Sequence, residues 1–538
     1  MKKRLSLIVV GCFVLMFAAS VALAKDYNVD YDEFVYVYSD DGTRICANLF
    51  TPVSVADGSQ ATMPDTFPAI IFPNSWSVEE HEYIIQAKRF AEKGYIVFSY
   101  SSRGWGFSGG QINTVGPLDM QDLSAIIDWI IANTPVDEAN IGISGISYGS
   151  GIALIGAAHD SRIKTAAAMS CWGDIVEAFY GNETPRLVWG GILVTMGRLT
   201  GRMHPEIEQN YNDLLNNQNI EEITAWGMER SPISHTDEIN RRGVPVYLSP
   251  NLQDEMFRPN SVMRYYSKLT SPKLMDITRG IHASSEGLGL VGIPNKVWDN
   301  VHDWMDHWLK GIDTGIMNRA PITLDIKDSD SHIELQDWPA DEITSQSYYL
   351  GKRDGFLIET GSLDNEPQTD TDSDEINSGI LSGAHTGIPV ISAGLEAHTP
   401  IQITTWVPGI SQNKAIVYQT GEFGSSRLIA GIPTLDIWME PSLPQAQIIA
   451  HLYDVNSLGI GTLITHGPMT LHNAVPGQPV RLSFEMVVTA YEMPEGHKLA
   501  IAIDTYDVNY GTPTDEDFTV KFHYGDEYES KLNIPYKD

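Results

Sequence analysis

The 538-residue sequence predicts an α/β domain with a mostly parallel sheet, followed by a second domain built of β-strands. Two observations predict this division. From residue 25 to about residue 318, short apolar runs typical of buried strands alternate with segments of helical spacing, which implies βαβ units and a sheet covered by helices. From residue 319 to residue 538, β-type runs follow one another between turn residues, as in an all-β sandwich or jelly roll.

The first domain opens with an expected hairpin, two β-rich runs on either side of Asp40-Asp41-Gly42. The expected strands after it are "PAIIFPN", "YIVFSY", "NIGISG", "IKTAAAMS", "VPVYLSP" and "KLMDITRG". The expected helices are "EEHEYIIQAKRFAEKG", "LDMQDLSAIIDWIIANT", "YGSGIALIGAAHD" and "NKVWDNVHDWMDHWLKG".

The alternation of strand and helix stops between residues 171 and 242. This stretch contains helix-like pieces such as "PRLVWGGILVTMGRL" without the next expected strand. We therefore expect a helical cap inserted between two sheet strands, above the edge of the sheet where ligands bind. The all-β domain is expected to begin after residue 318, with "ITLDIKD" as its first strand.

The first 24 residues have the pattern of a secretory signal peptide. Lys2, Lys3 and Arg4 precede an apolar run that ends in the small-residue sequence Ala22-Leu23-Ala24. We expect cleavage after Ala24 and a secreted or periplasmic protein; an uncleaved membrane anchor is the alternative. No later stretch is apolar enough to span a bilayer, so we expect no stable membrane insertion after cleavage.

The charge balance is strongly acidic. The formal net charge is −34, and loss of the three basic residues of the signal would make it −37. A surface of this sign argues against nucleic-acid binding. Cys46 and Cys171 are the two cysteines that follow the signal, and the sequence leaves open whether they form one disulfide or two free thiols.

An acidic stretch between expected strands of the second domain, residues 364–375, raises the question of calcium. Asp370, Asp372 and Asp374 alternate as in a calcium loop, but the glycine and the distal glutamate of an EF-hand are missing. A solvated loop is the favoured interpretation, and we expect no metal site and no cofactor.

The pattern G-x-S-x-G occurs at Gly145-Ile146-Ser147-Tyr148-Gly149, between an expected strand and an expected helix. This is the context of a nucleophile elbow, the sharp turn that exposes a catalytic serine in the α/β-hydrolase fold. A plain strand-to-helix turn is the alternative, and the flanking elements make it the weaker one. Ser144 and Ser150 fall outside the pattern.

A serine hydroxyl needs a base, and the base needs a carboxylate that orients it. In this fold the partners follow the serine in the order acid, histidine, on loops after strands. Asp254 comes four residues after "VPVYLSP", and His282 comes two residues after "KLMDITRG". We expect Ser147, Asp254 and His282 to form a catalytic triad, with Glu255 as the weaker candidate for the acid.

The oxyanion of the tetrahedral intermediate needs two hydrogen-bond donors. The expected donors are the backbone N–H of Tyr148 and a group of the loop after "PAIIFPN", where Ser75 and Trp76 lie. In the glycine-rich "SSRGWGFSGG", we expect Arg103 to pair with Asp119 or Asp122 as structural support. The lysine and hydroxyl of a phosphate-binding loop are missing there.

Several segments together resemble the cocaine-esterase-like acyl hydrolases related to X-Pro dipeptidyl-peptidases. These segments are "SYSSRGWGFSGGQ", "GISYGS", Asp337-Trp338-Pro339 with the following "YYL", "AHLYDVNSLGIGTLITHG" and "EGHKLAIAIDTYD". The resemblance spans nearly the whole chain after the signal. It implies an α/β-hydrolase domain with a helical cap, a galactose-binding-like jelly-roll domain packed near the active site, and Ser147, Asp254 and His282 as nucleophile, acid and base.

Two positions depart from the family pattern. Members that resemble cocaine esterase have a tyrosine in the oxyanion loop whose hydroxyl is a donor; here Trp76 stands there, which implies its backbone N–H as the donor. The related α-amino-acid ester hydrolases have two carboxylates just after the triad acid, where this chain has Met256 and Phe257. Trp172 is an expected wall of an apolar pocket, and Glu183 in the cap is the remaining candidate for charge near the substrate.

These observations predict a serine hydrolase that cleaves carboxylic esters, or amides, of a small-molecule substrate through an acyl-enzyme on Ser147. An X-Pro dipeptidyl-peptidase is the first alternative, although the carboxylates that would hold a free amine are not evident. The second alternative is a non-catalytic carbohydrate- or surface-binding protein, for which the likeness of the β-domain to sugar-binding jelly rolls is the best support.

Overall fold

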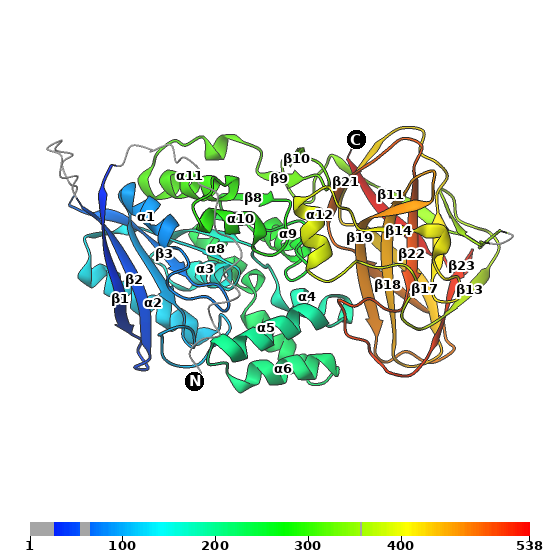
Figure 1. Ribbon diagram of the computed structural model, residues 1–538, viewed down its shortest axis with the longest axis horizontal. Coiled ribbons are helices and arrows are strands. Elements are labelled where there is room, and N and C mark those ends of the chain that lie inside the picture. Colours follow the sequence, from blue (N-terminus) through cyan, green and yellow to red (C-terminus); the bar gives the residue numbers. More distant parts are fainter. Residues whose placement is uncertain (1–25, 54–64, 356–357, 538) are drawn as a thin grey trace.

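A computed structural model describes residues 26–53, 65–355 and 358–537. The chain forms two domains that lie side by side, the first coloured blue to green in Figure 1 and the second yellow to red. The expected signal peptide, residues 1–24, lies outside the described residues. Within the ranges that are described, no helix is both long and apolar enough to cross a membrane.

A ten-stranded sheet forms the centre of the first domain, in the order β1-β2-β4-β3-β5-β6-β7-β8-β9-β10. The strands from β4 to β9 are parallel, and antiparallel pairs flank them at both edges. Their bounds are β1 (Asn28–Tyr38), β2 (Arg44–Val53), β3 (Phe67–Pro73), β4 (Ile96–Ser101), β5 (Val136–Ile146), β6 (Ile163–Met169), β7 (Val246–Ser249), β8 (Lys273–Ile277), β9 (Ile322–Asp325) and β10 (His332–Leu335). The expected hairpin is β1 and β2, and the expected mostly parallel sheet is confirmed.

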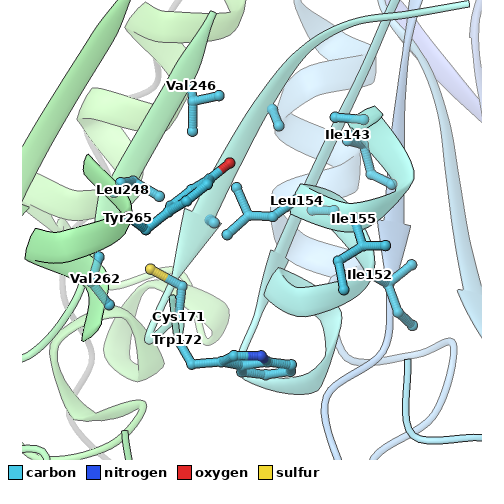
Figure 2. Packing of buried hydrophobic residues seen from close by; sticks show 14 of the residues in the cluster. Ile143, Ile152, Leu154, Ile155, Cys171, Trp172, Val246, Leu248, Val262 and Tyr265 are labelled. Carbon is cyan, nitrogen blue, oxygen red and sulfur yellow. The ribbon is translucent and has the colours of Figure 1, made fainter. Parts of the chain in front are cut away.

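Helices cover both faces of this sheet because its parallel strands are apolar on both sides. In β3, Ala69 and Ile71 belong to one hydrophobic cluster and Ile70 and Phe72 to another. The first cluster includes side chains of α2 (Pro117–Asn133), α3 (Tyr148–His159), α8 (Thr236–Arg242) and α9 (Pro259–Lys268); the second includes α1 (Ile84–Glu92) and α11 (Lys296–Lys310). Figure 2 shows part of the first cluster, where Leu154 of α3 lies near side chains of β7 and α9.

The segment between β6 and β7 is helical, as its composition predicts. It contains α4 (Ile175–Tyr180), α5 (Leu187–Thr200), α6 (Pro205–Leu215), α7 (Ile220–Glu229) and α8 (Thr236–Arg242). In Figure 1, α5 and α6 lie at the lower edge of the first domain, outside the sheet. We call residues 171–242 the cap.

The strand "ITLDIKD" lies in the first sheet and not in the second domain, where the sequence analysis put it. β9 pairs in parallel with β8, with Met275 opposite Ile322, and β10 pairs with β9. The local pattern of a short apolar strand is the same in either sheet, so only the long-range pairing distinguishes the two positions.

The second domain is an all-β sandwich. One sheet contains β11 (Ile343–Leu350), β13 (Asp372–Asn377), β16 (Arg427–Gly431), β17 (Thr434–Pro441), β20 (Val480–Glu485), β21 (Thr489–Met493), β23 (Thr519–Tyr524) and β24 (Lys531–Lys537). The other contains β12 (Gly361–Asp364), β14 (Thr404–Trp406), β15 (Ile416–Gln419), β18 (Ala446–Val455), β19 (Ile460–Leu471) and β22 (Lys498–Asp504). Inward-facing apolar side chains of both sheets form its core.

Polar contacts, some of them buried, join the two domains. The Arg258 guanidinium donates a 2.6 Å hydrogen bond to the Tyr510 hydroxyl, which also lies 2.6 Å from His466 Nε2. A short helix of the second domain, α12 (Ile391–His398), contacts α10 (Ser284–Leu290) through His398 Nε2 and Ser284 Oγ, 2.9 Å apart. The second domain therefore lies directly against the loops that follow β7 and β8.

The structure describes the two cysteines and the acidic stretch as follows. Cys46 and Cys171 are both buried and unpaired. In the acidic stretch, Asp372 and Asp374 form ion pairs with Lys352 and Arg353. Among the described residues, no group of three or more His, Cys, Asp or Glu side chains is arranged to hold a metal ion.

Candidate active site

Ser147 lies at the tight turn between β5 and α3. Its backbone angles, φ 55° and ψ −120°, fall in a region that non-glycine residues rarely adopt, and such strain is concentrated at functional sites. A Cβ atom on Gly145 would lie 2.5 Å from the Gly149 carbonyl, and one on Gly149 would lie 2.3 Å from the Pro73 carbonyl oxygen. The two glycines of G-x-S-x-G are therefore required by close backbone contacts.

The three side chains expected to form a triad converge at this turn. His282 Nε2 lies 2.7 Å from Ser147 Oγ, and His282 Nδ1 lies 2.7 Å from Asp254 Oδ2. Asp254 comes from the loop after β7 and His282 from the loop after β8, both at the carboxyl edge of the sheet, where β5 delivers Ser147. This is the connectivity of nucleophile, base and orienting carboxylate.

Asp254 orients His282 and stabilises the charged form of the imidazole. Asp254 is 2% exposed, and its Oδ1 accepts hydrogen bonds from the N–H groups of Met256 and Phe257 at 2.8 and 3.0 Å. Burial by itself lowers the pKa of His282, but the charge and hydrogen bond of Asp254 outweigh it, so the pKa is raised above the usual value of an imidazole. The Phe257 ring packs edge-on against the imidazole, with the two ring centroids 5.0 Å apart.

Glu255, the other candidate for the acid, faces the second domain. Its Oε1 accepts a 3.1 Å hydrogen bond from Asn509 Nδ2, and burial together with the nearby Asp507 raises its pKa to about 7. The neighbouring Asp254 holds the histidine instead, because the turn after β7 directs these consecutive side chains to different partners.

The loop after β3 lies opposite the turn that carries Ser147. Two of its backbone N–H groups already have acceptors: Asn74 N–H donates to the Tyr100 carbonyl oxygen, and Ser75 N–H donates to Glu82 Oε2. The indole of Trp76 donates to the Leu193 carbonyl oxygen of α5 at 3.0 Å, so the indole is engaged with the cap. The Trp76 backbone N–H remains the candidate donor of this loop, together with the Tyr148 N–H at the N-terminus of α3.

Two carboxylates of α2 support the same edge of the sheet. Arg103 donates bidentate hydrogen bonds of 2.7 and 2.6 Å to Asp122, as expected, and also pairs with Asp41. Asp119 instead accepts a 2.9 Å hydrogen bond from the Tyr148 hydroxyl. The Tyr148 side chain, which follows Ser147 in the sequence, is thereby fixed to α2.

An apolar pocket opens above Ser147, between the sheet edge and the cap. Its lining includes Ser147 and the aromatic side chains of Trp76, Tyr148, Trp172, Phe179, Tyr180, Tyr211, Trp226 and Phe257. None of the described residues that line it is Asp, Glu, Lys or Arg. Trp172 is part of the wall, as expected. Glu183 is not: it lies in the turn after α4, where its carbonyl oxygen is 2.9 Å from His472 Nε2 of the second domain.

Two carboxyl groups near Ser147 and His282 were not predicted from the sequence, one half-buried (Glu82) and one buried (Glu286). Glu82 precedes α1 and contacts Ser75, and Glu286 of α10 lies 3.4 Å from Asn251 Nδ2. Burial is the main cause that raises the pKa of both groups, to about 7 for Glu82. A single glutamate at the start of a helix is usually a capping or surface residue, so the sequence carries no signal that would identify either one.

Comparisons with known proteins agree with this architecture. Residues 41–284 match the family described as X-Pro dipeptidyl-peptidase (S15 family), and residues 314–532 match the C-terminal non-catalytic domain of X-Pro dipeptidyl-peptidase. Together these two matches cover most of the chain and both of its domains.

Solved structures share the fold over the whole chain. A CocE/NonD family hydrolase from Staphylococcus aureus superposes with a TM-score of 0.70 at 11% identity, covering 94% of this chain and 93% of the other. An aminopeptidase from a marine sediment Thaumarchaeota archaeon gives 0.70 at 13% identity, with 98% and 99% covered. An α-amino acid ester hydrolase gives 0.69 at 14% identity, with 99% and 100% covered. The sequence matches and the shared two-domain fold lead to one conclusion: the chain belongs to the X-Pro dipeptidyl-peptidase (S15) family of hydrolases.

Proposed function

We propose that the protein is a secreted or periplasmic serine esterase that cleaves carboxylic esters with an apolar acyl or alcohol group. Ser147 is the nucleophile, His282 the general base and acid, and Asp254 the residue that orients the imidazole. The backbone N–H groups of Tyr148 and Trp76 form the oxyanion hole, and Trp172 forms part of the substrate pocket.

In this reaction Ser147 Oγ attacks the ester carbonyl carbon while His282 Nε2 takes the hydroxyl proton. The negative charge that develops on the carbonyl oxygen is stabilised by the two N–H groups. When the tetrahedral intermediate collapses, His282 gives the proton to the leaving alkoxide, and the acyl group stays on Ser147. A water molecule, deprotonated by the same histidine, then releases the carboxylic acid and restores the serine.

The observation that carries the choice of substrate is the uncharged lining of the pocket above Ser147. A dipeptidyl-peptidase must bind the free N-terminal amine of its substrate, and a buried ammonium group needs a carboxylate partner. Met256 and Phe257, the second and third residues after the triad acid, offer none, and Glu183 does not line the pocket. The family description and the aminopeptidase among the structural neighbours keep an amide-cleaving activity as the alternative.

A non-catalytic carbohydrate-binding role is the alternative from a different class. It would not require hydrogen-bonded contacts among Ser147, His282 and Asp254, nor a strained backbone at the serine. These features favour catalysis.

The test has two steps. A fluorophosphonate probe should label the wild-type protein and the control variant Ser144→Ala, and should leave Ser147→Ala unlabelled; absence of label on the wild type would overturn the proposal. Turnover of p-nitrophenyl butyrate is then compared with that of Ala-Pro-p-nitroanilide. We expect activity on the ester, and activity confined to the anilide would favour the dipeptidyl-peptidase.

Location is tested separately. Expression of the full chain in a bacterial host with an intact secretion pathway should yield a protein outside the cytoplasm whose N-terminus, read by mass spectrometry, is Lys25. An intact Met1 on a cytoplasmic product would contradict secretion and leave the esterase proposal standing.

A further inference from the structure

The carboxyl group of Glu82 holds the loop that carries the proposed oxyanion donor. Glu82 Oε2 accepts the Ser75 N–H at 2.7 Å, and Glu82 Oε1 lies 2.6 Å from Ser75 Oγ. Trp76, whose N–H is the proposed donor, is the next residue along the chain. The two contacts fix both the backbone and the side chain of Ser75, and so fix the peptide that presents the Trp76 N–H.

The same turn is also attached to the strand that carries the nucleophile. Ser75 Oγ lies 3.0 Å from the Ile146 carbonyl oxygen, and the hydroxyl of Tyr83 accepts the Ile146 N–H at 3.0 Å. Ile146 immediately precedes Ser147. Residues 82 and 83, on one turn of chain, therefore fix the oxyanion loop and the last residue of β5 relative to each other.

We infer that Glu82 is a positioning residue for catalysis: through Ser75 it holds the Trp76 N–H at the distance from Ser147 that the oxyanion requires. The inference rests on the proposed function, because it assigns Glu82 to the oxyanion hole of that reaction. Oxyanion donors act only when they are fixed within a few tenths of an ångström of the developing charge, so a residue that fixes the donor affects the transition state more than the bound ester.

The contact between Glu82 and Ser75 can persist in both protonation states of the carboxyl group. An ionised Glu82 accepts a hydrogen bond from the Ser75 hydroxyl. A protonated Glu82 can donate to Ser75 Oγ, whose own proton then points to the Ile146 carbonyl oxygen. Burial raises the pKa of Glu82 to about 7 although the hydrogen bonds from Ser75 oppose this shift. Both protonation states are therefore relevant near neutral pH, and Oε2 can accept the Ser75 N–H in either.

The test uses the full-length protein and three variants, Glu82→Ala, Glu82→Gln and Ser75→Ala, together with the double variant Ser75→Ala/Glu82→Ala. For p-nitrophenyl butyrate we expect Glu82→Ala to lower kcat about 10- to 100-fold with KM changed less than about threefold, as for loss of part of an oxyanion hole. Glu82→Gln keeps one acceptor oxygen and should retain more activity than Glu82→Ala. Because both side chains act through one contact, the double variant should lose little more than Glu82→Ala alone.

The control is Glu79→Gln, on the same turn and with no described contact to Ser75, which should leave kcat unchanged. Thermal unfolding identifies any variant that fails to fold, and Glu82→Gln, which is nearly isosteric, then carries the test. A kcat within twofold of wild type in folded Glu82→Ala and Glu82→Gln, a change in KM alone, or independent losses in the double variant would each overturn the inference.

The rate of fluorophosphonate labelling separates this inference from the proposed function. If the wild type is labelled but does not cleave the ester, the substrate is wrong, and the labelling rate of Glu82→Gln still tests the positioning role. If the wild type is not labelled, the proposed function fails and the positioning role fails with it.

Discussion

The indole N–H of Trp76 donates a 3.0 Å hydrogen bond to the carbonyl oxygen of Leu193, and so connects the loop after β3 to helix α5 of the cap. The contact is close, because a Cβ atom on Gly197 of the same helix would lie 2.9 Å from the Trp76 ring. The side chain that replaces an expected tyrosine thus contacts the cap, and only its backbone N–H is left for the proposed oxyanion role.

The variant Trp76→Phe removes this hydrogen bond and keeps the backbone N–H. One neutral hydrogen bond is worth about 0.5–1.5 kcal/mol, so we expect KM for an apolar ester to rise about 2- to 10-fold. The value of kcat should stay within about threefold of wild type because the oxyanion donor is unchanged. Steady-state kinetics checks this, and a 100-fold loss of kcat at constant KM would show that the indole itself stabilises the transition state.

The raised pKa of His282 predicts the acid limb of the pH profile. The base must be neutral to take the serine proton, and Asp254 stabilises the protonated form, so the limb should lie at a pH above the ordinary imidazole pKa of about 6.5. In Asp254→Asn the carboxylate charge that stabilises the protonated imidazole is lost, so burial should lower the pKa of His282 and move the acid limb to lower pH. The value of kcat/KM should also fall about 10³- to 10⁴-fold.

The kinetic measurement is kcat/KM between pH 4.5 and 9. Glu255→Gln is the matched control, since this neighbouring carboxyl group contacts Asn509 of the second domain and not the histidine. A limb that shifts equally in both variants would mean that the overall negative charge of the loop, and not the contact at 2.7 Å, sets the pKa of His282.

A side chain at Gly151 of α3 is expected to disturb the packing of Trp172. A Cβ atom there would lie 2.2 Å from the Trp172 ring, far inside contact distance. Gly151→Ala should therefore displace Trp172 and lower the free energy of unfolding by about 1–3 kcal/mol, with a changed KM because Trp172 lines the pocket. Gly287 of α10 has open space at its Cβ position, so Gly287→Ala is the control and should leave stability equal or slightly higher. Calorimetry distinguishes the two; equal stability of both variants would contradict the packing argument.

Substitution of Tyr510 measures how much the contact between the two domains contributes to stability. Tyr510→Phe removes the acceptor of the buried Arg258 guanidinium and the contact to His466, so we expect the free energy of unfolding to fall by about 1.5–3 kcal/mol. Tyr348→Phe, whose hydroxyl bonds to Tyr536 inside the second domain, is the comparison. Urea unfolding should show the transition of the first domain shifted in the former variant and not in the latter. An unshifted first transition in both would mean that the interface adds nothing to the stability of the first domain.

The fold and the meeting of three side chains were predictable because both follow from local patterns. Strands that end before Ser147, Asp254 and His282 all belong to a parallel sheet, and parallel strands bring their carboxyl ends to one edge. What depended on distant contacts was not predictable. The strand at Ile322 could pair with either sheet, and Glu82 has no motif of its own, because its role arises only where the chain brings it to Ser75.

The cap is one uninterrupted stretch of chain, residues 171–242, and it supplies most of the aromatic wall of the pocket, whereas the reacting side chains lie outside it. The residues proposed to set substrate preference and those proposed to cleave the bond thus lie in separate stretches of the sequence. A mutant library confined to codons 175–227 should yield altered acyl-chain preferences at high frequency while nearly every folded member keeps a phosphonate-reactive serine. Under the proposed function, natural sequence changes in the cap could therefore alter which ester is cleaved while the contacts among Ser147, His282 and Asp254 stay unchanged.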